Sequence, residues 1–411
     1  MKLLKVDTIE QARQKLLDCF KGKEPPTQSV ELCDAQGKIL AEDVFSKEDI
    51  PSFYRSTVDG YGVKARDTQG ASDSVPTFLE IVEDIAIGTQ SKRTIASGEC
   101  AYVPTGGMIP QGADAMVMVE FAEAFDENHI AVYESVACGK SVVVPGEDIK
   151  QGQLVLKKGT ELKAPQIGAL AAAGVWMVKV FCPITVSIIS TGDELAQVEQ
   201  TPEPGMVRDV NSWALKAIAH QVGMKVVMVK KLQDDEELLK QTIKNAMEIS
   251  DLVLTSGGSS QGKKDMTSQV LDELASPGVF THGLAIKPGK PTILGFDEIS
   301  STLLVGLPGH PVAALSVFQM LLVWLWKKRT FQEPQMPIMA KMSTNVPGAP
   351  GKTTCILTQL TQGESGYMAT PILGKSGLIN TMTKAQGYIV IEMNKEGLQC
   401  GETVNIYRFG L

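Results

Sequence analysis

The sequence predicts a multidomain α/β and β protein, with a central parallel α/β domain, a β-rich inserted domain and a small C-terminal β-barrel. The chain has 411 residues, more than one hydrophobic core usually serves. Apolar strands alternate with helices from residue 184 to about residue 329, a pattern typical of a parallel sheet. Short strands between Gly, Pro and Asp residues fill residues 75–144 and return near the C-terminus.

We expect four domains along the chain. Residues 1–44 and 146–180 form a discontinuous N-terminal domain, residues 45–145 the β-rich insertion, residues 181–330 the α/β domain and residues 331–411 the barrel. Thr8 can cap a first helix whose apolar residues recur at helical spacing. This helix is expected to pack on another domain or subunit.

Within the α/β domain we predict strands over residues 186–190, 225–229 and 252–254. Asn211 or Ser212 is predicted to cap the helix between the first two strands, and Asp234 the helix that follows the second. The apolar stretch 312–326 has 15 residues, fewer than the roughly 20 needed to span a bilayer, so it predicts a buried helix.

A glycine turn after the third strand is the centre of the candidate site. It spans residues 255–262, and helical spacing resumes at Met266. Backbone N–H groups at a strand-to-helix turn are unpaired and attract anions. Two further glycine-bearing loops, residues 287–291 and 307–311, follow it. Three such loops and two lysines predict a cradle for phosphate or another oxyanion.

Several interpretations of the turn remain open on these residues alone. Residues 257–263 are one residue short of a P-loop, because a lysine follows where Ser or Thr should reach Mg²⁺. Residues 258–262 also fit a nucleophile elbow, with Ser260 as nucleophile and a downstream histidine as base. A third possibility is a small-residue turn needed only for close packing.

Three carboxylates follow neighbouring strands of the predicted sheet. Glu194 follows the first strand, Asp234 the second and Asp265 the third. Because the carboxyl ends of parallel strands meet at one edge, we expect these side chains to converge. Alone, Asp234 also fits a helix cap and Glu194 a solvated turn acid. Together the three predict a divalent-metal phosphoryl site.

Several motifs, in a fixed order along the chain, carry a resemblance to a known family. The central ones are Ser256-Gly257-Gly258 with Gly262 and Asp265, then residues 285–291 and 306–311. Others occupy residues 56–61, 104–107, 146–148, 190–195 and 374–379, so they span nearly the whole chain. These motifs resemble the molybdopterin molybdenumtransferase family, MoeA. Many relatives carry an arginine before the last motif, and the corresponding stretch 355–358 has none.

The resemblance implies a molybdopterin-binding α/β domain and the last step of molybdenum cofactor synthesis. In that step adenylylated molybdopterin releases AMP and molybdate is inserted into the pterin dithiolene. The implied metal is Mg²⁺, on Glu194, Asp234 and Asp265. The implied catalytic residues are these three with Asp59, Thr105 and Asp148. The implied substrate-binding residues are Ser256, Gly257, Gly258, Lys287, Lys290, Pro308, Gly309, His310, Pro311 and Ser376.

The resemblance also implies a homodimer in which the Asp59 loop of one subunit reaches the α/β domain of the other. A molybdopterin adenylyltransferase and molybdoenzymes are the implied protein partners. Two alternatives belong to other classes: a pterin-binding protein without catalysis, and a serine hydrolase that uses Ser260. On its dipeptide alone, Asp59 before Gly60 would be a plain turn residue.

Composition excludes several classes of function. The net charge of −8, from 39 basic and 47 acidic residues, argues against nucleic acid as a general partner. Seven cysteines without a CxxC pair or a Cys/His cluster fit neither a disulfide framework nor a structural zinc site. The first ten residues contain no apolar core for a signal peptide. We therefore expect a cytoplasmic protein that does not enter the membrane.

Overall fold

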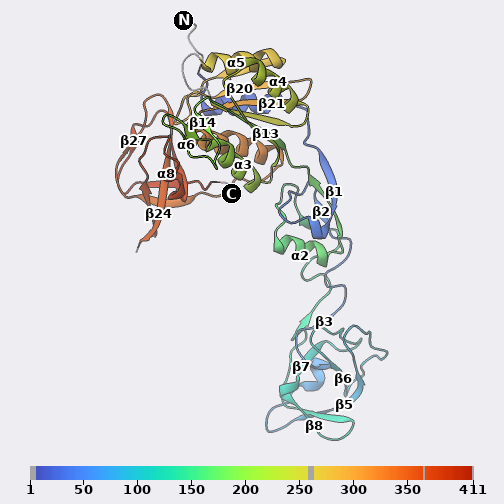
Figure 1. The fold of residues 1–411 in the computed structure, drawn as a ribbon. Helices are drawn as coiled ribbons and strands as arrows, with labels where there is room; N and C mark the ends of the chain where they lie inside the picture. The colour runs from blue at the N-terminus through green and yellow to red at the C-terminus, as the bar shows by residue number, and fades with distance from the viewer. Residues whose placement is uncertain (1–5, 258–262, 364–365, 410–411) are drawn as a thin grey trace.

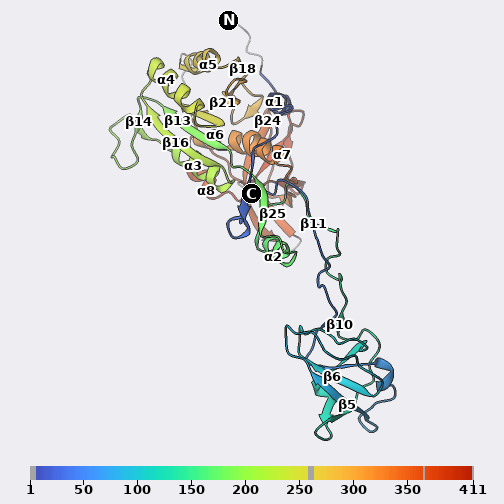
Figure 2. The same cartoon turned by 90° about the vertical axis from the view of Figure 1, so that its right-hand side faces the viewer.

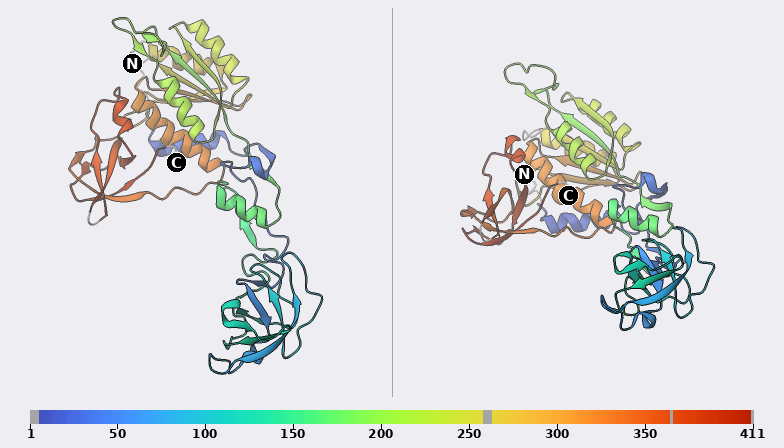
Figure 3. Two further views of the ribbon diagram at one scale, coloured as in Figure 1. Left: turned by 60° about the horizontal axis from the view of Figure 1, so that its bottom comes forward. Right: turned by 90° about the horizontal axis from the view of Figure 1, so that it is seen from below.

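The computed structural model describes residues 6–257, 263–363 and 366–409, with side chains described outside residues 263–265. The molecule is elongated (Figure 1). The α/β sheet and the C-terminal strands lie side by side at one end, and the β-rich insertion lies at the other (Figures 1, 2 and 3). The predicted class, a multidomain α/β and β protein, is confirmed.

The α/β unit is built on a six-stranded sheet covered on both faces. In order, its strands are β16 (Lys225–Leu232), β13 (Thr185–Thr191), β17 (Leu252–Gly257), β21 (Thr302–Leu307), β20 (Ile293–Asp297) and β18 (Pro277–His282). The first four are parallel to one another, β20 runs antiparallel to β21, and β18 runs antiparallel to β20. The strand β20 reverses because only residues 298–301 connect it to β21, too few for a crossover.

Helices cover the two faces of this sheet with separate cores. On one face lie α3 (Asn211–Gln221) and the long helix that begins at α6 (Pro311–Val317). On the other lie α4 (Glu236–Met247) and α5 (Lys263–Leu274), whose Leu239 and Val270 pack in a second apolar cluster. The sheet is therefore buried on both sides, as its near-continuous apolar strands require.

The apolar stretch 312–326 is the buried helix that the sequence predicted. It runs through α6, a π-helical turn η4 (Phe318–Val323) and α7 (Trp324–Arg329). In a π-helical turn the backbone hydrogen bonds join residues five apart, not four apart. Within this turn the Met320 carbonyl accepts hydrogen bonds from Arg13 Nε (3.2 Å) and Nη2 (2.9 Å). Within the described ranges no helix is long and apolar enough to cross a membrane.

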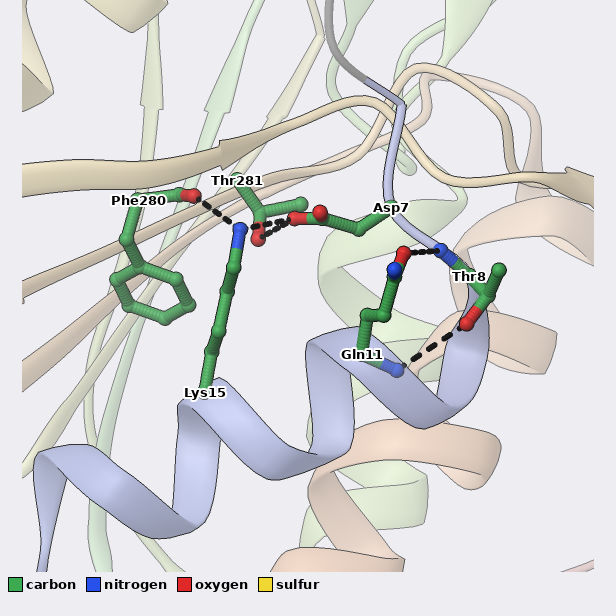
Figure 4. Close-up of polar contacts among 6 residues, drawn as sticks. All are labelled: Asp7, Thr8, Gln11, Lys15, Phe280 and Thr281. Carbon is green, nitrogen blue, oxygen red and sulfur yellow. Dashed lines mark hydrogen bonds and ion pairs between the residues drawn. The ribbon is translucent and has the colours of Figure 1, made fainter.

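The first helix, α1 (Ile9–Cys19), packs against this long helix. As predicted, Thr8 caps it, in a reciprocal capping box with Gln11. The buried Asp7 accepts hydrogen bonds from Lys15 Nζ and Thr281 Oγ1, both at 2.6 Å (Figure 4). These bonds join the N-terminal segment to strand β18 of the α/β unit.

Pairs of antiparallel strands lead from the α/β unit to the insertion. They are β1 (Thr27–Glu31) with β12 (Met177–Phe181), β2 (Val44–Phe45) with β11 (Leu154–Leu156), and β3 (Arg55–Ser56) with β10 (Val142–Val143). The short helix α2 (Ala164–Ala172) packs beside β11. The chain therefore leaves and returns along the same narrow connection (Figure 2).

The insertion is a curled six-stranded sheet. Its order is β7 (Ala115–Met118), β4 (Gly60–Val63), β6 (Glu99–Val103), β5 (Thr77–Asp84), β9 (His129–Val132) and β8 (Ala122–Ala124). Gly60 lies so close to β7 that a Cβ atom there would stand 2.0 Å from the Val117 carbonyl oxygen. Only glycine fits this strand crossing.

The C-terminal strands close into a small barrel. Their order is β19 (Ile286–Lys287), β24 (Thr353–Gly363), β25 (Gly366–Pro371), β22 (Ile338–Met342) and β28 (Thr403–Ile406), and β26 (Gly387–Ile391) pairs with β24. Tyr388 and Tyr407 exchange backbone hydrogen bonds of 2.8 and 2.9 Å, which join β26 to the chain just after β28. The strand β19 belongs in sequence to the α/β unit, so it ties the two units together.

Two predicted helix caps are wrong by one or two residues. Asp235, not Asp234, caps α4 by accepting from the Leu238 N–H (2.9 Å). Helix α3 begins at Asn211 itself, and Asp209 accepts from the Ser212 N–H (3.0 Å). Asp235 stands three residues before its donor, the spacing that an N-cap interaction prefers, whereas Val210 holds the N-cap position of α3 and Asp209 precedes it.

Candidate active site at the strand ends

The carboxyl ends of β13, β17 and β21 meet at one place, which we call the strand-end site. It consists of Thr191, Asp209, Asn211, Ser256 and Gly309. Gly257, at the end of β17, has φ +138°, and a Cβ atom there would stand 2.0 Å from the Thr191 carbonyl oxygen. A side chain at this position would push β17 away from β13. Close packing of the two backbones therefore explains why a glycine is needed at position 257.

Asn211 joins two of the predicted substrate-binding loops. Its Nδ2 donates to Ser256 Oγ (2.6 Å) and to the Gly309 carbonyl (2.9 Å). Ser256 lies near the end of β17, Gly309 follows β21, and Asn211 is 8% exposed. Because a carbonyl accepts, the nitrogen must face Gly309, which leaves Oδ1 without a partner among the described residues. A ligand N–H or O–H would satisfy this acceptor.

Asp209 fixes the start of α3 against β13. Its Oδ1 accepts from Ser190 Oγ (3.2 Å) as well as from the Ser212 N–H. The Ser190 and Ser212 hydroxyls lie 2.8 Å apart. All three side chains are buried. The first turn of α3 therefore has a fixed position relative to the strand-end site, and its start brings Asn211 to the two loops.

Two of the three predicted metal ligands lie on neighbouring loops. These ligands are Glu194 and Asp234. Asp193, the neighbour of Glu194, exchanges two hydrogen bonds with Asp234: the Asp193 N–H donates to Asp234 Oδ2 (3.3 Å), and the Asp234 N–H donates to Asp193 Oδ1 (3.1 Å). Glu194 folds its carboxylate back toward Gly192, where a Cβ would stand 2.7 Å from Oε2. The loops after β13 and β16 are therefore held together.

The third predicted ligand, Asp265, lies in α5, and its side chain is outside the described part of the structure. Among the side chains that are described, no group of three His, Cys, Asp or Glu residues is placed to hold a metal ion. Gly258 and Ser260 also lie outside the described residues. The structure therefore leaves the nucleophile-elbow interpretation without a described nucleophile.

The barrel contributes to the same region through Ser376. The His310 ring Nδ1 lies 2.8 Å from Ser376 Oγ, and the Val312 N–H donates to the Ser376 carbonyl (3.2 Å). His310 occupies the N-cap position of α6, and Pro311 is the first residue of that helix. The loop that carries Pro308 and Gly309 is thus held from the barrel side as well as by Asn211.

Lys287 and Lys290 lie in the segment between the sheet and the barrel, and both are exposed. Lys287 is the last residue of β19, which pairs with β24 of the barrel. Gly289 between them packs closely, because a Cβ atom there would stand 2.7 Å from Val317 Cγ2 on α6. The close packing fixes the backbone between the two lysines and leaves both ammonium groups accessible to an anion.

Asp59, Thr105 and Asp148 are not brought to the strand-end site of the same chain. Asp59 Oδ1 accepts from the Thr105 N–H (2.7 Å), so these two residues do meet, in the insertion. Asp148 lies in the connection to the insertion, where its N–H donates to the Ile50 carbonyl (3.1 Å). All three residues are exposed, and the insertion lies at the far end of the molecule (Figures 1 and 2).

Sequence reasoning missed the part that Asn211, Asp209, Ser190 and Ser212 play. Asn211 and Ser212 were considered only as helix caps. The available signal was the polar pattern Asp-x-Asn-Ser at the start of a helix of the α/β domain. It does not reveal partners more than 40 residues away, such as Ser256, which is separated from Asn211 by 45 positions.

Comparison with known proteins gives matches along nearly the whole chain. Residues 7–174 match the MoeA N-terminal region (domain I and II), residues 187–328 a probable molybdopterin binding domain, and residues 339–409 the MoeA C-terminal region (domain IV). A molybdopterin molybdenumtransferase of Haemophilus influenzae is 31% identical over 98% of both chains. One of Staphylococcus epidermidis is 31% identical over 92% of this chain and 90% of the relative.

Solved structures agree with these matches. Two crystal structures of a molybdopterin biosynthesis MoeA protein from Pyrococcus horikoshii superpose with TM-scores of 0.81 and 0.82, at 33% and 29% sequence identity. Each comparison covers 98% of this chain and 99% of the other. The similarity therefore includes the α/β unit, the insertion and the barrel.

Proposed function

The chain belongs to the MoeA family, whose members act in molybdenum cofactor biosynthesis, and we propose that it inserts molybdate into adenylylated molybdopterin with release of AMP. One observation carries the assignment of this reaction to the strand-end site. Three predicted substrate-binding segments are held together, because Asn211 bonds to Ser256 and Gly309, and Ser376 contacts His310 beside Gly309. The Ser256 and Ser376 hydroxyls and the start of α6 are thereby brought to one region, which we assign to an anionic ligand.

We assign the phosphates of the pterin nucleotide to this arrangement. The loop at Gly309 precedes α6, so the N-terminus of that helix lies beside the Ser256–Asn211 contact. Lys287 and Lys290 add two positive charges to neutralise the phosphates and the incoming molybdate. In a chain of net charge −8, such local positive charge is what lets an anion bind.

We propose Mg²⁺ as the metal, on Glu194, Asp234 and Asp265. The fit rests on the donor chemistry, because carboxylate oxygens are the ligands that Mg²⁺ prefers, and on the bonds between Asp193 and Asp234 that hold two of the loops together. When bound, Mg²⁺ supplies charge that makes a diphosphate a better electrophile and stabilises the departing AMP. The protein residues orient the anhydride and hold it beside the oxyanion.

We further propose that the active unit is a homodimer in the cytoplasm. Asp59 and Thr105 are paired in the insertion, far from the strand-end site of their own chain. A second copy would place this pair beside the site. All seven cysteines are free thiols, as a reducing compartment requires. An adenylyltransferase must supply the substrate, and molybdoenzymes must accept the product.

The experiment that tests the reaction uses the purified protein with adenylylated molybdopterin, molybdate and Mg²⁺. We expect AMP release from the wild type. We expect Asp265→Asn to bind the pterin nucleotide and to lose AMP release, because that carboxylate holds the metal and not the pterin. Normal turnover of Asp265→Asn would show that the metal assignment is wrong, while its failure to bind would show a role in substrate binding instead.

A further inference from the structure

A second cavity, of about 200 Å³, lies at the opposite edge of the α/β sheet from the strand-end site. Its walls are the amino ends of the parallel strands and the end of the long helix. The apolar lining includes Ile184, Leu252, Leu303, Leu322, Leu325 and Trp326. The segment after α1, with Phe20, covers one side. None of these residues takes part in the proposed reaction.

Arg329 reaches this cavity from the end of α7, and Lys23, Glu24 and Asp251 are the other charged residues of its lining. Its guanidinium carbon lies 3.9 Å from the centre of the Phe20 ring, and its Nη2 donates to the Lys23 carbonyl (3.2 Å). Burial lowers the pKa of Arg329. A guanidinium has five N–H donors, so most remain available.

No carboxylate in the described part of the chain forms an ion pair with Arg329. Asp251 also lines the cavity; burial, the larger effect, lowers the pKa of Arg329 and the Asp251 charge raises it, while Asp251 Oδ2 accepts from the Thr185 N–H (2.8 Å) and Oγ1 (2.6 Å). A half-buried cation without an ion pair is costly, and an anionic ligand would relieve that cost. The other cation at the rim, Lys23, donates to Ser301 Oγ (2.8 Å).

We propose that this cavity binds a small aromatic carboxylate, with its ring among the apolar side chains and its carboxylate on Arg329. A cavity of about 150 Å³ accepts benzene, so the volume here suits one ring with a short acidic arm. Phe20 and Trp326 offer ring contacts, and the planar guanidinium matches a carboxylate. The site does not depend on the molybdenum reaction.

Cys182 gives a position-specific test, because it lines the cavity and is half-buried. We expect phenylacetate to slow the reaction of Cys182 with N-ethylmaleimide, with half-protection on the order of 1 mM for a ligand of about ten heavy atoms. The exposed Cys33, Cys138 and Cys400 serve as internal controls and should react at unchanged rates. Mass spectrometry of the digested protein measures each cysteine separately.

Two comparisons identify the role of Arg329. Phenylacetamide, which lacks the charge, should protect about tenfold less well, and Arg329→Gln should weaken phenylacetate to a similar degree. The neighbouring exposed Lys328→Gln is the matched control and should bind as the wild type does. Equal protection by acid and amide, or slower reaction of all cysteines, would overturn the proposal. The acid–amide comparison needs only the wild type, so it holds even if Arg329→Gln fails to fold.

Discussion

At the residue scale, Asn211 is the side chain on which the strand-end site most depends. It is buried and bridges Ser256 and Gly309, and its Oδ1 has no partner in the described structure. We expect Asn211→Ala to raise KM for the pterin nucleotide and to lower kcat by about tenfold to a hundredfold, because the loops lose their common donor. Initial-rate kinetics of AMP release separate the two effects.

The control for this prediction is the neighbouring Trp213→Ala, since Trp213 is 60% exposed on α3. Asn211→Asp should be as damaging as the alanine variant, because a carboxylate would face the Gly309 carbonyl without a proton to donate. A mutant that loses thermal stability but keeps wild-type KM and kcat would limit Asn211 to a role in folding.

The two lysines of the loop after β19 give a prediction about charge. Lys287→Ala and Lys290→Ala should each weaken binding of the phosphorylated ligand more at low salt than at high salt, because the Debye length falls from about 30 Å at 0.01 M to about 8 Å at 0.15 M. Equilibrium binding at several salt concentrations is the measurement. Equal losses at every ionic strength would argue against a charge role.

Residue roles were only partly predictable from sequence. Glycine turns and cap spacings are local, so Thr8 and the loop around Gly309 could be recognised without a fold. The contact of Asn211 with Ser256 depends on which strands lie next to each other, and no local pattern determines that. The error of one residue at Asp234 arose because Asp235 beside it is chemically identical.

At the element scale, the N-terminal segment is held to the α/β unit by a buried polar contact. Asp7 is 3% exposed and accepts from Lys15 and Thr281 (Figure 4). We expect Asp7→Ala to lower the free energy of unfolding by about 1–3 kcal/mol, because Thr281 loses a buried acceptor while the partly exposed Lys15 can regain water. Denaturant unfolding measures the change.

The exposed Gln14→Ala on the same helix is the matched control, with an expected change within about 0.5 kcal/mol. A loss of stability no larger than that of the control would mean that the Asp7 contact makes no net contribution.

Helices and strands were the most predictable features, since the helix over 312–326 follows from its apolar length alone. The contact of its π-helical turn with Arg13 was not predictable, because Arg13 lies more than 300 residues away in the sequence.

At the scale of the whole molecule, the distance between the insertion and the strand-end site leads to a prediction about subunits. If the Asp59 loop acts on a partner, Asp59→Asn and Asp265→Asn homodimers should both be inactive. A mixture that exchanges subunits should regain roughly a quarter of wild-type activity, because about half the dimers are mixed and each carries one intact site.

Mass spectrometry shows whether exchange has taken place in this mixture. Exchange without recovery of activity would contradict the shared site, as would a monomer that is fully active when dilute. The sequence could predict a C-terminal barrel but not which strands close it. That closure depends on the pairing of Tyr388 with Tyr407 and on β19, which the α/β unit contributes to the barrel.

We propose that one site both cleaves the nucleotide and loads the metal oxyanion. The most direct measurement follows AMP and molybdenum-loaded cofactor together in a single turnover of the wild-type protein with adenylylated molybdopterin, molybdate and Mg²⁺. We predict that the two products appear in equal amounts, and that both are lost together in Asn211→Ala. AMP release without molybdenum insertion, or no AMP at all, would contradict the account.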